Sequence, residues 1–235
     1  ELIRHWGYPA EVHNVTTEDG YILNLFRIPY GRSSETNSSC TRPAILLAHG
    51  TGVGSNVFLI NPPASNPALI LADAGFDVFL LDHRGTTYSK RHTTLSPGDN
   101  KFWQFTLDEL AKYDVPAGID KALKLTGKSS LYFIGYSQGT VIGFMTLAEN
   151  PAYNHKVKAM FQLGPAGTLG FGRGFLRFAV IAYNTLKPIF DFYRNFLGAH
   201  EINAQWRFAY QPLSHICNVI LGHEVCRVRK SALEI

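Results

Sequence analysis

The chain has 235 residues, 46% of them hydrophobic, so it can bury a large core, and one domain with an appendage fits better than two equal domains. No stretch approaches the roughly 18 consecutive apolar residues of a membrane-spanning helix, so none is predicted. The formal charge is +4, and the lysines and arginines are scattered apart from Arg227-Val228-Arg229-Lys230, with no basic stripe that carries interleaved stacking aromatics, which argues against nucleic-acid binding.

The beginning of the chain predicts a β-hairpin. Two runs rich in β-branched and aromatic residues, Val12–Thr17 and Tyr21–Ile28, flank the turn Glu18-Asp19-Gly20. Residues 29–43 are rich in Gly, Ser, Thr and Asn, which is typical of a surface loop.

Residues 44–163 alternate between buried strands and helices. Short apolar runs predict strands, and longer runs with capping or stop signals predict helices. The expected strands are Ala44–Ala48, Phe76–Asp82, Leu131–Ile134 and Val157–Leu163, and the expected helices are Pro67–Gly75, Phe105–Thr126 with a kink at Pro116, and Thr140–Glu149. Residues 86–103 predict a polar loop. This alternation indicates an α/β fold with a mostly parallel sheet and right-handed crossovers.

The segment Gly135-Tyr136-Ser137-Gln138-Gly139 has the G-x-S-x-G pattern of a nucleophile elbow. It follows a predicted strand and precedes a predicted helix, which is the context that the motif requires. We expect a tight turn that exposes the hydroxyl of Ser137 above the sheet edge. Each flanking glycine is expected to be necessary because a Cβ there would collide with a neighbouring strand or helix.

A glycine-rich turn, His49-Gly50-Thr51-Gly52-Val53-Gly54, follows the first buried strand. It lacks the lysine of a phosphate-binding P-loop, and its glycine spacing differs from the dinucleotide-binding fingerprint. The alternative is an oxyanion-hole loop, in which the backbone amides of Thr51 and Gln138 would bind a developing negative charge.

The glycosylation sequons and the cysteines of the sequence concern the cellular compartment. N-glycosylation sequons begin at Asn14 and Asn37 and fit a secretory route. Of three cysteines, the close pair Cys217 and Cys226 is the expected disulfide, which leaves Cys40 free. No Cys-x-x-Cys or His-x-His cluster is present, so neither a metal nor a cofactor is predicted.

From Gly167 onward aromatic residues crowd into short helical patterns broken by Gly and Pro. We interpret residues 1–166 as the α/β core and residues 167–235 as a partial helical cap, with ordinary core helices as the alternative. An exposed aromatic face on such a cap would contact lipid or another protein.

Several motifs together resemble the acid lipase family of α/β-hydrolases, which includes lysosomal acid lipase and gastric lipase. They are His5–Glu11, Thr16–Leu23, His49-Gly50, Leu71–Gly75 with Asp77-Val78, Arg84-Gly85, Lys90 to Pro97, Phe102-Trp103, Asp108-Glu109, Ala111–Asp114, the elbow, and the pair Cys217 and Cys226. The resemblance covers nearly the whole chain. It departs at Tyr136, where the family usually has histidine, and at Thr51, where it has leucine.

The resemblance implies an esterase for triacylglycerols or cholesteryl esters at a lipid–water interface, working at acidic pH in a lysosome or outside the cell. It makes Ser137 the nucleophile and the amides of Thr51 and Gln138 the oxyanion hole. The departure at Thr51 matters little because the donor is the backbone amide.

A serine nucleophile also needs a histidine base and a carboxylate, in the chain order Ser, acid, His. The candidate acids after Ser137 are Asp191, Glu201 and Glu224, and the candidate bases are His200, His215 and His223. All lie in the predicted cap, whereas the family has these groups on strands that follow the cap. We therefore expect neither partner within this sequence, and little ester hydrolysis by this chain alone.

Two other functions stay open at this point. One is a non-catalytic lipase relative that binds lipid or a partner protein through its aromatic cap. The other is an α/β-hydrolase for small esters or thioesters, which would differ only in its pocket. Oligomeric state is not indicated by the sequence.

Overall fold

The centre of the fold is a pair of short strands made entirely of buried residues. The computed structural model describes residues 1–32, 42–167, 181 and 184–188, and in it β3 (Ala44–Ala48) and β4 (Asp77–Leu81) are buried along their whole length. β3 pairs in parallel with β4 on one side and with β6 (Leu131–Tyr136) on the other. β7 (Val157–Leu163) continues the parallel part beside β6. These strands confirm the predicted α/β fold.

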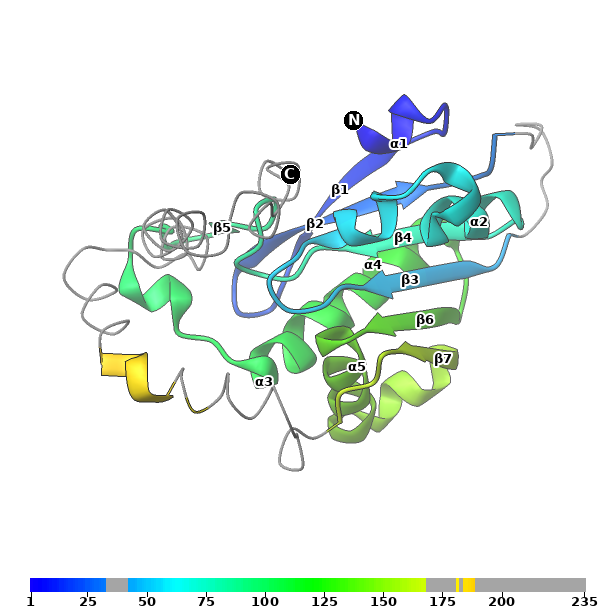
Figure 1. Cartoon of the computed structure of the whole chain (residues 1–235). Helices are drawn as coiled ribbons and strands as arrows, with labels where there is room; N and C mark the ends of the chain where they lie inside the picture. The colour runs from blue at the N-terminus through cyan, green and yellow to red at the C-terminus, as the bar shows by residue number, and fades with distance from the viewer. Residues whose placement is uncertain (33–41, 168–180, 182–183, 189–235) are drawn as a thin grey trace, which may run out of the picture. The chain divides into compact units, whose positions relative to one another are not determined.

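The predicted N-terminal hairpin forms and completes the sheet on its other side. β1 (Glu11–Thr16) and β2 (Tyr21–Ile28) are antiparallel, and Gly20 in their turn has a φ of 96°. β2 also pairs antiparallel with β4, which gives the strand order β1-β2-β4-β3-β6-β7 (Figure 1).

The predicted polar loop 86–103 is more ordered than expected. It contains β5 (Arg91–His92), which pairs with β2, and the 3-10 turn η3 (Asn100–Trp103). A two-residue strand depends on its partner strand and has no periodicity of its own, so the local sequence does not reveal it.

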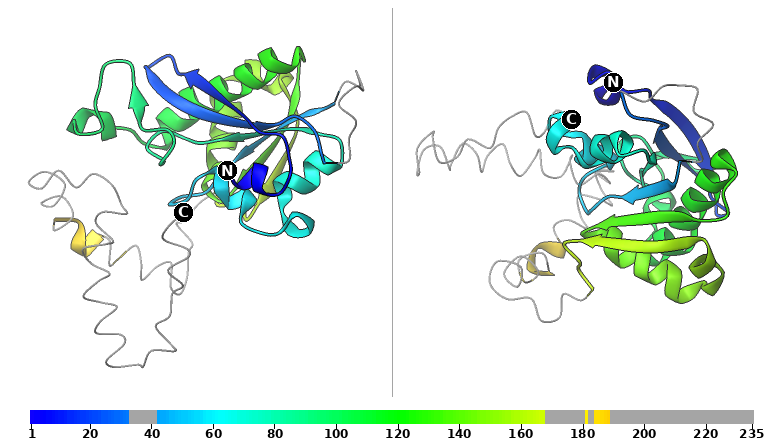
Figure 2. Two further views of the ribbon diagram at one scale, coloured as in Figure 1. Left: turned by 90° about the horizontal axis from the view of Figure 1, so that it is seen from above. Right: turned by 90° about the vertical axis from the view of Figure 1, so that its right-hand side faces the viewer.

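Helices cover both faces of the sheet. α1 (Leu2–His5) and α2 (Pro67–Asp73) lie on one face, and α4 (Val115–Thr126) and α5 (Gln138–Glu149) lie on the other (Figures 1 and 2). Successive side chains of a strand point to opposite faces, so each buried strand contributes to two cores. Leu46 packs with the α4 and α5 side, whereas Ile45 and Leu47 pack with the α2 side.

The predicted helix Phe105–Thr126 consists of three consecutive parts. These are α3 (Leu107–Glu109), a π-helical turn η4 (Leu110–Asp114) and α4. Pro116 has no N–H, so it cannot donate to a carbonyl one turn back. The hydroxyl of Thr146 on α5 donates to the carbonyl of Ala111 at 2.7 Å, so this carbonyl in the π turn before Pro116 has a hydrogen-bond donor. The kink expected at Pro116 therefore takes the form of a wider turn just before it.

Three further 3-10 turns connect these elements: η1 (Ser55–Leu59), η2 (Pro63–Ser65) and η5 (Pro151–His155).

The chain divides into two compact units, Glu1–Phe171 and Gly172–Ile235. Only residues 181 and 184–188 of the second unit are described, and they are helical. The division into a core of residues 1–166 and a cap of residues 167–235 stays a prediction. None of the described helices has both the length and the apolar character needed to cross a bilayer.

Candidate active site

Ser137 occupies the turn between β6 and α5 in a strained backbone conformation. Its φ is 51° and its ψ is −113°, and among the described residues it alone has a positive φ without being glycine. Such a conformation costs about 1–3 kcal/mol and persists only where neighbours over-determine it. The Ser137 N–H donates to the carbonyl of Leu163 at 2.9 Å, and the Ser137 carbonyl accepts from the N–H and hydroxyl of Thr140 at 2.9 and 2.6 Å. The predicted sharp turn is therefore present.

Both flanking glycines are required by close backbone approaches, as predicted. A Cβ on Gly139 would lie 2.2 Å from the carbonyl oxygen of Ala48 at the end of β3. A Cβ on Gly135 would lie 2.6 Å from the carbonyl oxygen of Gly139 and 2.5 Å from Oε1 of Gln162. These contacts bring the first turn of α5 directly onto the end of β3.

The glycine-rich loop begins beside Ser137. A Cβ on Gly50 would lie only 3.1 Å from the Cβ of Ser137 and 3.3 Å from the ring of Tyr136. Thr51 follows as an exposed residue, and Gln138 is the first residue of α5, whose N-terminal amides have no partner within the helix. Within the described part of the chain, no hydrogen bond from the amide of Thr51 or Gln138 occupies it. The loop and the helix start are thus neighbours of the same serine.

His49 holds the peptide that carries the Thr51 amide. Its Nδ1 lies 2.8 Å from the carbonyl oxygen of Gly50, and its Nε2 lies 3.2 Å from the backbone nitrogen of His83. Because a carbonyl can only accept and a backbone N–H can only donate, these partners assign the proton to Nδ1. Burial lowers the pKa of His49 to about 4 and so favours this neutral form. The Gly50 carbonyl and the Thr51 N–H belong to one trans peptide, so fixing the first orients the second.

The end of β4 supplies two more buried polar residues next to this loop. Oδ1 of Asp82 accepts from the backbone N–H of Ser55 at 2.6 Å, and it lies 3.8 Å from Nε2 of His49. The rings of His49 and His83 have centroids 4.6 Å apart. Burial raises the pKa of Asp82 to about 6 and lowers that of His83 well below its ordinary value. Sequence reasoning missed this cluster, although an Asp-His pair directly after a buried strand is a signal that could have indicated it.

Arg84 links the same chain segment to the rest of the core. Its guanidinium donates to Asp114 from Nε at 2.8 Å and to Asp19 from Nη1 at 2.6 Å, and it stacks 4.0 Å above the ring of Tyr21. Arg84 and Asp114 are both fully buried, so their charges are compensated inside the core. Arg84 therefore has a structural role between hairpin, loop and helix.

The described residues provide no histidine or carboxylate as a partner for the side chain of Ser137. The sequence candidates Asp191, Glu201, Glu224, His200, His215 and His223 all lie outside the described residues, as do Asn37, Cys40, Cys217 and Cys226. Asn14 is described and is exposed on β1.

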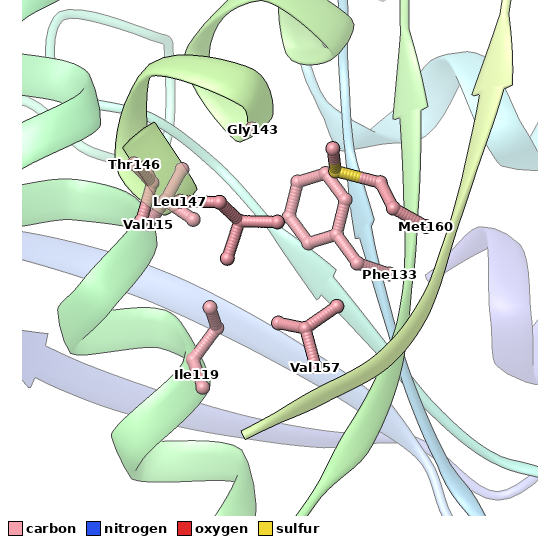
Figure 3. A pocket seen from close by; sticks show the side chains of 8 residues that line it. All are labelled: Val115, Ile119, Phe133, Gly143, Thr146, Leu147, Val157 and Met160. Atoms are coloured by element: carbon pink, nitrogen blue, oxygen red, sulfur yellow. The ribbon is translucent and has the colours of Figure 1, made fainter. Parts of the chain in front are cut away.

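Two cavities lined by described residues lie away from this site. An apolar crevice lies between α4, α5, β6 and β7, where Phe133, Met160 and Ile119 leave no room for a water molecule (Figure 3). A second groove of about 340 Å³ lies between β1 and α4 and is lined by Asn14 and Lys121 among others. Across the described part of the chain, no three metal-ligating side chains converge.

Comparison with known proteins identifies the family. A family model described as "alpha/beta hydrolase fold" matches residues 43–199, more than half of the chain, and one described as "Partial alpha/beta-hydrolase lipase region" matches residues 1–62. The chain belongs to the α/β-hydrolase family. A crystal structure of a VrEH2 mutant shares the α/β-hydrolase fold with a TM-score of 0.50 at 18% identity, covering 91% of this chain and 55% of that chain.

Sequence relatives of this α/β-hydrolase are lipases and include gastric and lysosomal acid lipases, in agreement with the resemblance that the motifs indicated. Lipase lipl-1 of Caenorhabditis elegans is 44% identical over 76% of this chain and 44% of its own length. Mouse gastric triacylglycerol lipase is 42% identical over 81% of this chain and 48% of its own length. Human lysosomal acid lipase/cholesteryl ester hydrolase is 37% identical over 96% of this chain and 55% of its own length. The chain spans about half the length of the curated relatives it matches.

Proposed function

We propose that this chain carries the nucleophile and oxyanion hole of a carboxylic ester hydrolase that acts on lipid esters. The observation that carries the proposal is the strained turn at Ser137, which hydrogen bonds with Leu163 and Thr140 hold and which packs against the start of the glycine-rich loop. Strain of this kind at a G-x-S-x-G turn favours a serine that reacts, because a structural serine would relax into an ordinary conformation.

The mechanism follows from the geometry of the turn. The hydroxyl oxygen of Ser137 attacks the ester carbonyl carbon while its proton passes to a histidine base that the protein supplies from outside the described residues. The carbonyl oxygen becomes an oxyanion, which accepts hydrogen bonds from the amides of Thr51 and Gln138. Expulsion of the alcohol, protonated by the same base, leaves an acyl-serine that water then hydrolyses.

Two features of the fold support charge stabilisation at this place. Gln138 is the first residue of the twelve-residue helix α5, whose N-terminal end carries partial positive charge. The Thr51 amide is oriented through the His49 contact to the Gly50 carbonyl. Preorganised donors of this kind contribute a factor of about 10²–10³ each to the rate of acyl transfer.

The substrate class and setting are proposed from the relatives. The names of two of them refer to triacylglycerols and cholesteryl esters and to gastric and lysosomal proteins. We propose the same lipid esters here, a secreted or lysosomal location, glycosylation at Asn14 and Asn37, and a disulfide between Cys217 and Cys226. The exposed position of Asn14 supports glycosylation at this residue.

The experiment is to treat the full-length protein with a fluorophosphonate probe and to measure hydrolysis of an emulsified triacylglycerol. Ser137→Ala should abolish both labelling and turnover. Ser129→Ala is the matched control because Ser129 is exposed on a surface turn before β6, and it should leave both unchanged. Persistent turnover in Ser137→Ala would refute the assignment of the nucleophile.

A further inference from the structure

Tyr136, the residue before the proposed nucleophile, has a side chain that the proposed mechanism does not use. Side chains along β6 alternate between the two faces of the sheet, so Tyr136 lies on the same face as Tyr132 and Ile134, which pack with the α2 side. Tyr136 is exposed at the end of the strand, and the described part of the chain offers no hydrogen-bond partner to its hydroxyl. Its interactions within the described structure are therefore packing contacts of the ring.

The ring of Tyr136 is wedged between the start of the glycine-rich loop and the turn that follows the loop. A Cβ on Gly50 would lie 3.3 Å from both Cδ1 and Cε1 of Tyr136, so Gly50 lies directly against the ring. The ring of Phe58 in η1 meets the ring of Tyr136 edge to face, with centroids 6.4 Å apart. Phe58 is buried, so the contact ties Tyr136 to the core beneath η1.

The hydrogen bonds of the loop tie it to a different part of the sheet. The Gly50 carbonyl is held by His49 at the end of β3, and the Ser55 N–H donates to Asp82 after β4 at 2.6 Å. Within the described ranges, no hydrogen bond joins residues 50–55 to the elbow. The separation between loop and elbow is therefore set by packing, and on the elbow side the Cβ of Ser137 and the ring of Tyr136 face Gly50.

This separation matters because one proposed oxyanion donor lies on each side of it. The Thr51 amide belongs to the loop, and the Gln138 amide belongs to the first residue of α5. We propose that Tyr136 is a positioning residue for acyl transfer, whose ring sets the separation between the Thr51 and Gln138 amides. This inference rests on the proposed function, because that function makes these two amides the oxyanion hole. In this scheme the ring acts through Gly50 and touches no reacting atom.

Loss of the ring should lower kcat rather than raise KM. In Tyr136→Ala the loop would lose its packing partner on the elbow side, and the Thr51 amide could move relative to the oxyanion. A misplacement of about 1 Å can cost a factor of about 10² in rate. For a water-soluble short-chain p-nitrophenyl ester we expect kcat of the full-length protein to fall about 10–100-fold, with KM changed by less than about threefold, because the oxyanion forms only after the ester has bound.

Two variants separate this role from a general loss of stability. Tyr136→Phe keeps the ring and should keep kcat within about threefold of the parent value. Tyr132→Ala is the matched control, because Tyr132 lies on the same face of β6 but packs against Phe76, with ring centroids 5.9 Å apart. It should lower the Tm while leaving kcat and KM within about threefold of the parent values.

Several outcomes would overturn the role of the ring. They are a kcat of Tyr136→Ala close to that of the parent, an equal loss in Tyr132→Ala, or a loss in Tyr136→Phe as large as in Tyr136→Ala. A change confined to KM would also overturn it, because the ring would then contact the bound ester instead of positioning the loop.

A second measurement does not need activity. Amide hydrogen exchange of the full-length protein can follow Ser55, which is bonded to Asp82, and Val57, whose N–H donates to the Gly54 carbonyl at 3.1 Å. In Tyr136→Ala both amides should exchange at least about threefold faster than in the parent, whereas Tyr136→Phe and Tyr132→Ala should match the parent. Unchanged exchange in Tyr136→Ala would overturn the packing role. A parent without ester hydrolysis refutes the proposed function instead, and the exchange rates still decide whether the ring holds the loop.

Discussion

Gly139→Ala is the substitution that the geometry of the elbow should tolerate least. The added Cβ would lie 2.2 Å from the carbonyl oxygen of Ala48, 2.8 Å from its carbonyl carbon and 3.0 Å from the carbonyl oxygen of His49. All three are backbone atoms of the β3 end, so no side chain can rotate away. Either α5 must move outward by roughly 1 Å, judged from an ordinary carbon–oxygen contact, or the end of β3 must move.

The expected loss of stability is about 2–3 kcal/mol. Overpacking a core by one methyl group costs about 1–3 kcal/mol, and a clash between two backbones lies at the upper end because relaxation must displace whole elements. A loss of 1 kcal/mol lowers the Tm by roughly 2–4 °C in a domain of 150–250 residues, so the Tm should fall by roughly 4–12 °C. Alanine has the higher helix propensity, but that gain of about 1 kcal/mol is offset by the clash.

Thermal unfolding followed by circular dichroism measures this effect directly. Gly98→Ala is the matched control, because Gly98 lies in an exposed turn where the nearest atom to the new Cβ is the Ser96 hydroxyl at 3.7 Å. Its Tm should change by about 1 °C or less. If Gly139→Ala unfolds within 2 °C of the parent protein, the close packing of α5 against β3 is wrong, and with it the placement of Ser137.

Two further substitutions test the buried polar contacts around the site. Arg84→Met should lower the free energy of unfolding by about 3–5 kcal/mol, because it leaves the carboxylate of Asp114 buried without its cation. Urea unfolding measures this loss, and a urea midpoint equal to that of the parent would contradict the ion pair. Thr146→Val should cost about 1–3 kcal/mol, since it removes the hydroxyl that donates to the Ala111 carbonyl beside the π turn. For this variant the same urea titration is decisive, and an unchanged midpoint would mean that the carbonyl finds another donor.

The strained serine connects the stability of the fold with its proposed chemistry. Ser137 is held in place by hydrogen bonds from and to segments on both sides, including Leu163 at the end of β7. Thr140 is fully buried at the start of α5, whereas Leu163 is exposed at the end of β7, so the strain is held from one buried and one exposed element. Substitutions in this support should therefore reduce activity before they unfold the protein.

Local patterns along the chain were enough to predict most of the elements and the elbow. The strand Ala44–Ala48 and the helix end before Pro151 agree with the structure because apolar runs, glycines and prolines act on their own neighbourhood. The position of Ser137 and the need for its flanking glycines could also be predicted, because the strand, the turn and the helix start of the motif lie within a few residues of one another in the sequence.

Contacts between distant segments decided the rest. The buried cluster of His49, Asp82 and His83 forms because β3 and β4 are parallel neighbours in the sheet and end at the same edge, although His49 and Asp82 lie far apart in the chain. The π turn before Pro116 likewise depends on a hydroxyl that α5 supplies. Residue types and local spacing thus determined where the nucleophile would be, whereas the protonation states and loop contacts around it depend on burial, which only the packed structure establishes.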